Sequence, residues 1–154
     1  MAITVGTNSY ISVADTTTYF AARLYADDWT SASDGDKEKA LLMARRLLDQ
    51  QEFLGCRTSD DQLLAWPRSG VRGVDSSAVP AAVIDAQCEL ALAFLRDDLT
   101  ADDSNRGVRR MKAGSVELEY DGRAPAKGLP DAVTALLQSF LATLSSASSV
   151  QLVF

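Results

Sequence analysis

The stretch "VPAAVIDAQCELALAFL", Val79 to Leu95, decides the fold of this chain. Pro80 suits the first position of a helix, because the backbone N–H that proline lacks would have no partner there. The helix predicted from Ala81 to Leu95 has no wide polar face, so other elements must cover it on several sides. The residues that make it apolar nearly all round are Val83, Ile84, Cys88, Leu90, Ala91, Leu92, Phe94 and Leu95. We therefore expect a mainly α-helical domain built around this helix.

Three further helices are predicted, each with an apolar stripe at helical spacing. The first begins at Ser12, where Asp15 three residues later gives a capping-box-like pattern. The second runs roughly over 37–52 and has Gly55 as its natural stop. The last begins near Pro130. Together they predict a four-helix bundle with a long irregular loop at about 56–79.

A small β-hairpin is predicted at about 107–121. Its second strand alternates apolar residues with Glu117 and Glu119, which is the period of a half-buried strand. Its first strand is basic, so the two strands can pair through opposite charges across the hairpin. The basic residues are Arg109, Arg110 and Lys112. They are either a paired or solvated arm, or an inter-subunit contact to the acidic loop 97–103 of a neighbour.

The last ten residues form an extended arm after a helical domain at 1–144. A serine- and alanine-rich spacer is typical of a flexible linker. It is followed by alternating apolar residues, Val150, Leu152 and Phe154. The arm can fold back on its own domain, or it can add to a partner as a strand or insert into a cleft. We favour partner docking, because a fold-back does not need the flexible spacer.

Composition argues against an enzyme. The chain of 154 residues has the length of one domain and contains no histidine, which removes the commonest general base and metal ligand. Its two cysteines cannot build a disulfide framework or a zinc site. We expect no catalytic residue, no metal and no cofactor. No apolar run approaches the roughly 20 residues of a membrane span, and the N-terminus lacks the basic region of a secretory signal, so synthesis in the cytoplasm is expected.

The segment "LLAWPRSGVRG", 63–73, has two interpretations. Trp66 and Arg68 can organise the long loop and its contacts with a partner, or Trp66 can be a stacking platform for single-stranded DNA. A nucleic-acid-binding protein is expected to have a basic face. The formal net charge here is −6 and the pI about 4.6. We therefore predict that the segment organises the loop and binds a partner.

The order of five segments resembles a known family. The segments are "YISVADTTTYFAAR", "KEKALLMARRLLD", "FLG", "LLAWPRSGV" and "VPAAVIDAQCELAL". They resemble a tailed-phage family often labelled DnaT-like single-stranded DNA-binding proteins, and they are similar to head-tail connector proteins, also called adaptor or head-completion proteins. The resemblance spans roughly residues 10–144.

The connector resemblance implies a structural protein of the virion neck, without an active site. It implies a dodecameric ring beneath the portal protein, a tail-side neck or tail-completion partner, and a channel through which DNA passes without specific binding. An acidic ring would repel phosphate, which suits that passage. Two alternatives stay open. One is a DnaT-like single-stranded DNA-binding replication protein, which predicts salt-dependent binding. The other is a cytoplasmic helical interaction domain.

Overall fold

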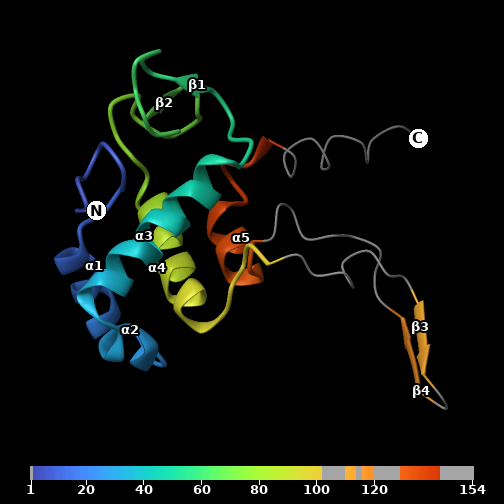
Figure 1. Cartoon of the computed structure of the whole chain (residues 1–154). Coiled ribbons are helices and arrows are strands. Elements are labelled where there is room, and N and C mark those ends of the chain that lie inside the picture. Colours follow the sequence, from blue (N-terminus) through green and yellow to red (C-terminus); the bar gives the residue numbers. More distant parts are fainter. Residues whose placement is uncertain (1, 102–109, 114–115, 120–128, 143–154) are drawn as a thin grey trace, which may run out of the picture.

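The computed structural model describes residues 2–101, 110–113, 116–119 and 129–142, and for the two middle segments it describes the backbone (Figure 1). These residues are mostly helical. The helices are α1 Val13–Ala21, α2 Asp27–Ser31, α3 Asp34–Asp49, α4 Ala81–Arg96 and α5 Asp131–Leu137. Two antiparallel ribbons accompany them: β1 Cys56–Arg57 with β2 Arg68–Ser69, and β3 Arg110–Ala113 with β4 Val116–Glu119.

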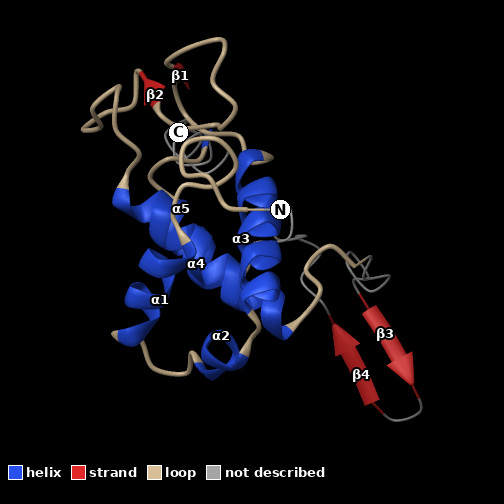
Figure 2. Cartoon of the chain, turned by 60° about the vertical axis from the view of Figure 1, so that its left-hand side comes forward, coloured by secondary structure: helices blue, strands red, loops and turns tan. Residues whose placement is uncertain are grey.

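The central position of α4 is confirmed. It packs against α3, α5 and α2, and it crosses the middle of the helical body in both views (Figures 1 and 2). It begins directly after Pro80, as predicted. Its fully buried side chains are Val83, Ala86, Gln87, Cys88, Leu90 and Ala91. Coverage from several sides explains why this helix has no wide polar face. No helix in the described residues is long and apolar enough to cross a membrane.

The predicted four-helix bundle is not confirmed, because the described residues form five helices. α1 starts as predicted, with the Ser12 hydroxyl accepting a hydrogen bond from the Asp15 N–H at 3.1 Å. It ends at Ala21, and Tyr25 then takes a left-handed backbone conformation with φ 60°. The additional helix α2 follows this break. It buries Trp29 against α1, where the indole N–H donates to the Thr17 hydroxyl at 3.1 Å.

The second predicted helix is displaced along the chain. α3 begins at Asp34, after Ser33 as N-cap, and ends at Asp49, three residues earlier at each end than predicted. Gly55 therefore does not stop this helix. It has φ +73°, and a Cβ at this position would lie 2.2 Å from the Ser69 carbonyl oxygen. Glycine is required here by the close approach of β1 and β2.

α5 is shorter than the predicted last helix. It ends at Leu137, and the following residues return to the chain after α3. The Leu54 N–H donates to the Phe140 carbonyl at 2.8 Å, and the Ala142 N–H donates to the Glu52 carbonyl at 2.8 Å. The predicted arm with Val150, Leu152 and Phe154 lies outside the described residues, so partner docking by the arm stays a prediction.

The backbone of the hairpin pairs the basic strand with the acidic strand, as the charge pattern predicts. Arg110 lies opposite Glu119, and Lys112 lies opposite Glu117. Arg109 is outside the described residues. An inter-subunit role for these basic residues stays a prediction, because the structure contains one chain.

Candidate nucleic-acid interface

The loop at 56–79 lies at one end of the helical body, away from α1 and α2 (Figures 1 and 2). Trp66 holds this loop to the core. Its side chain is 1% exposed, and its ring packs edge-on against Phe53 at 5.5 Å and Phe140 at 5.6 Å between centroids. A buried indole cannot stack on a DNA base, so the stacking interpretation of Trp66 is not supported by its position.

Arg68 is bound to the loop itself. Its guanidinium donates to the carbonyls of Leu54 at 2.8 Å, Ala65 at 3.1 Å, Gly55 at 2.8 Å and Phe53 at 3.4 Å. An arginine has five N–H donors, and this arrangement uses most of them on backbone oxygens. Arg68 therefore holds the backbone segments of the loop together. Few of its N–H groups are left to bind a phosphate or a partner.

A partly buried carboxylate, that of Asp49, joins the loop to α3 and to the N-terminal segment. Asp49 Oδ1 accepts hydrogen bonds from the Tyr10 hydroxyl at 2.5 Å and from the Ala65 N–H at 3.4 Å. The Tyr10 hydroxyl in turn accepts from the Trp66 N–H at 3.2 Å. Burial raises the pKa of the Asp49 carboxyl. Burial, and then the charge of Asp49, raise the pKa of Tyr10.

The raised pKa of Asp49 predicts a pH dependence of stability. The folded chain binds this proton more tightly than the unfolded chain, so the free energy of unfolding falls as pH rises from about 3.9 through the folded pKa. Asp49→Asn keeps the Oδ1 acceptor and removes the titration. We expect the stability of the variant relative to the native chain to increase between pH 4 and pH 7 in urea unfolding. Parallel pH profiles for the two proteins would contradict this, and exposed Asp34→Asn is the control.

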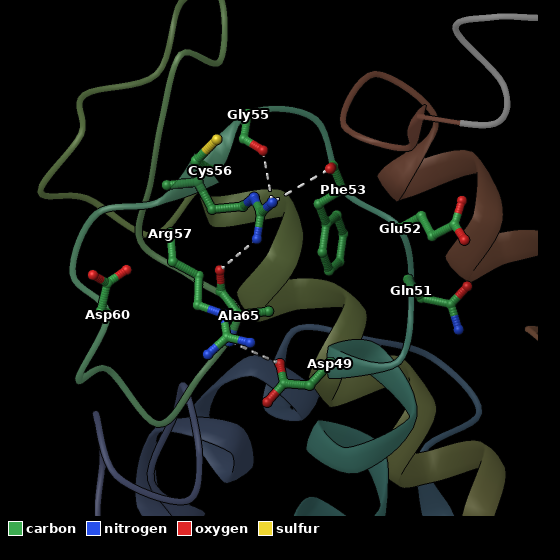
Figure 3. A pocket seen from close by; sticks show the side chains of 10 residues that line it. Asp49, Gln51, Glu52, Phe53, Gly55, Cys56, Arg57, Asp60 and Ala65 are labelled. Carbon is green, nitrogen blue, oxygen red and sulfur yellow. Dashed lines mark hydrogen bonds between the residues drawn. The ribbon is translucent and has the colours of Figure 1, made fainter.

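A cleft of about 690 Å³ opens between the end of α3 and the loop (Figure 3). Its wall combines two arginines, three carboxylates and an aromatic ring. These residues are Arg57, Arg68, Asp49, Glu52, Asp60 and Phe53. The mixture of charges does not make a phosphate pocket, because the carboxylates cancel the arginines and Asp49 already pairs with Arg45 at 3.5 Å. It does place hydrogen-bond donors and acceptors side by side.

The arginines that remain available are concentrated at this end. Among the described residues, Arg46, Arg57 and Arg72 are exposed and make no ion pair, and the last two lie in the loop. At the other end, arginines are neutralised: Arg23 pairs with Glu89 at 2.8 Å, and Arg96 with Asp28 at 2.8 Å. The loop itself is neutral, because Asp60, Asp61 and Asp75 balance its three arginines, so it lacks the acidic excess that gives the chain its net charge of −6.

Sequence reasoning did not select Arg57, Arg72 or the cleft. The available signal was the local charge: the segment 56–79 contains three arginines and three aspartates, whereas 2–55 contains five basic and eight acidic residues. Within the described residues, no group of three or more His, Cys, Asp or Glu is placed to hold a metal ion. Burial raises the pKa of the Cys88 thiol to about 12, so this cysteine is an inert core residue.

Comparison with protein families gives one match. A family model described as "Putative DnaT-like ssDNA binding protein" matches residues 2–153. No curated protein and no solved structure gives a significant match. The head-tail connector prediction is wrong on this evidence, together with its ring beneath the portal and its unbound passage of DNA. Since the match covers nearly the whole sequence, the chain belongs to the DnaT-like ssDNA-binding family.

Proposed function

We propose that this protein binds single-stranded DNA, and that the loop end of the molecule contacts the strand. The observation that carries the proposal is the family match over residues 2–153. The exposed, unpaired guanidinium groups of Arg57 and Arg72 support the choice of surface. The protein acts by binding, and the proposal includes no catalytic step.

The mode of binding follows from the side chains at this end. Guanidinium groups bind phosphate oxygens with paired N–H donors, and they also stack on bases. Trp66 and Trp29 are each 1% exposed, so neither contributes a stacking surface. The net charge of −6 opposes the approach of a polyanion. Binding is therefore expected to be weak at physiological salt and to strengthen as salt is lowered.

The test is a salt titration with a fluorescently labelled oligonucleotide of twelve thymidines, followed by anisotropy. Each phosphate contact to single-stranded DNA contributes about 0.7 to the slope of log affinity against log salt. The variant Arg57→Ala/Arg72→Ala is expected to lower this slope by about 1.4. The label belongs on the DNA, because buried tryptophans are poor reporters of a surface contact.

A matched control removes the same charge elsewhere. Lys39→Ala/Arg46→Ala takes two exposed cations from α3 and leaves the loop unchanged. It should keep most of the native slope. An equal decrease of the salt slope in both double variants would show that binding depends on overall charge, and it would contradict a DNA interface in the loop. Absence of binding by the native chain at 50 mM salt would refute the proposed function.

A further inference from the structure

The cleft at the end of α3 has a composition that suits a base better than a phosphate. Building on the proposed function, we propose that it holds a guanine of the bound strand, with Arg57 and Asp60 as the recognising residues. This goes beyond general binding, because it assigns a base preference and a pocket to the interaction.

The two side chains are available for a ligand. Arg57 and Asp60 are both exposed and line the same cleft (Figure 3). Within the part of the chain that the structure describes, neither side chain takes part in an ion pair. The neighbouring Arg68, in contrast, is held by backbone carbonyls. A guanidinium and a carboxylate therefore border the cleft with their hydrogen-bonding groups unused.

The size and charge of the cleft fit a neutral aromatic heterocycle. Its volume of about 690 Å³ falls within the roughly 300–1,000 Å³ of small-ligand sites. The carboxylates of Asp49, Glu52 and Asp60 are balanced by Arg57, Arg68 and the Arg45 that pairs with Asp49 at 3.5 Å, so the cleft has no net positive charge to attract a phosphate group. A base carries no charge and presents several donors and acceptors at its edges. The phosphates of a guanine-containing strand would then lie outside the cleft, whereas on an all-thymidine strand, which offers no guanine, Arg57 contacts phosphate instead.

Guanine matches the available groups better than the other bases. Its N1–H and N2–H₂ are adjacent donors, which one carboxylate can accept together, as in a bidentate pair. Its O6 and N7 are adjacent acceptors, the usual partners of arginine. Adenine and cytosine place an acceptor next to their amino group, and thymine has acceptors on both sides of its N3–H. A carboxylate would face an acceptor in each of these three cases.

The experiment compares twelve-residue thymidine oligonucleotides that carry one substituted base at the centre. Native protein should bind the strand with one guanine about tenfold more tightly than the all-thymidine strand, since a good bidentate pair gives discrimination of about this size. Inosine lacks the N2 amino group and 7-deazaguanine lacks N7, so each should lose most of the preference. A central adenine or cytosine should bind like thymine.

Two neighbouring variants separate recognition from charge. Asp60→Asn removes the carboxylate that accepts from guanine, so it should abolish the preference, while thymidine binding stays equal or becomes tighter with less repulsion. Asp61→Asn changes the next residue, which is exposed and does not line the cleft, and it should keep the preference. Loss of the preference in both variants would overturn the assignment of Asp60.

The outcomes distinguish the two proposals. If native protein binds both strands equally, the guanine assignment is wrong and the proposed function stands. If it binds neither strand at low salt, the proposed function itself is wrong. If Asp60→Asn still prefers the strand with one guanine, the cleft is not the site that recognises guanine.

Discussion

Trp66→Ala is expected to lower the free energy of unfolding by about 3–5 kcal/mol, the usual effect of truncating a large buried aromatic side chain. This is a large part of the stability of a typical domain. The side chain is 1% exposed, and the change would leave a cavity between the loop, Phe53 and Phe140. It would also remove two edge-to-face contacts, each worth about 0.5–1.5 kcal/mol beyond burial. Urea unfolding followed by far-UV circular dichroism gives the measurement.

Trp66→Phe is the conservative variant for the same site. It keeps an aromatic ring against Phe53 and Phe140, and it removes an indole N–H that is buried without a hydrogen-bond partner in the described residues. We expect its effect to be less than half of the alanine effect. A loss below about 1 kcal/mol for Trp66→Ala would mean that the ring does not belong to the core. Oligonucleotide binding by the folded fraction should persist in Trp66→Phe, because the indole is no part of the proposed interface.

Gln87→Met is expected to lower the free energy of unfolding by about 2–4 kcal/mol, although the two side chains have similar volume. Gln87 is fully buried in α4. Its Oε1 accepts from the Tyr10 N–H at 2.9 Å, and its Nε2 donates to the Ser9 hydroxyl at 2.8 Å and the Leu41 carbonyl at 3.0 Å. Methionine would leave the Tyr10 N–H buried without a partner, which is the largest single cost.

Gln87→Met should also weaken the structure locally around Tyr10, in addition to lowering the free energy of unfolding of the whole domain. Hydrogen exchange of the Tyr10 amide is expected to accelerate in Gln87→Met, because this amide has lost its acceptor. Gln138→Met changes an exposed glutamine in the turn after α5 and should alter stability by no more than about 0.5 kcal/mol. Similar stability losses in the two variants would contradict the role of Gln87 as the link between the N-terminal segment, α3 and α4.

A net charge does not report where charges lie on the folded chain. The value of −6 argues against a nucleic-acid-binding face. Among the described residues, however, Arg23 and Arg96 are paired at one end, whereas Arg57 and Arg72 make no ion pair in the loop. The total charge of the sequence does not show which arginines are paired, because pairing depends on which side chains meet after folding.

The sequence by itself determined the features that depend on near neighbours in the chain. The apolar residues of α4 predicted a central helix, the spacing of Ser12 and Asp15 predicted a helix start, and opposite charges predicted that β3 pairs with β4. These signals are readable because helix caps, helical periodicity and strand alternation involve residues a few positions apart.

Tertiary structure alone decided the features that join distant residues. Gln87 meets Tyr10 across 77 positions, and Asp49 meets Tyr10 across 39. Gly55 is needed because β2 passes within 2.2 Å of where its Cβ would be. The cleft likewise combines the end of α3 with loop residues that follow it. A buried polar group needs a hydrogen-bond partner, and folding can bring that partner from any part of the chain. Local sequence patterns therefore do not predict which residue it is.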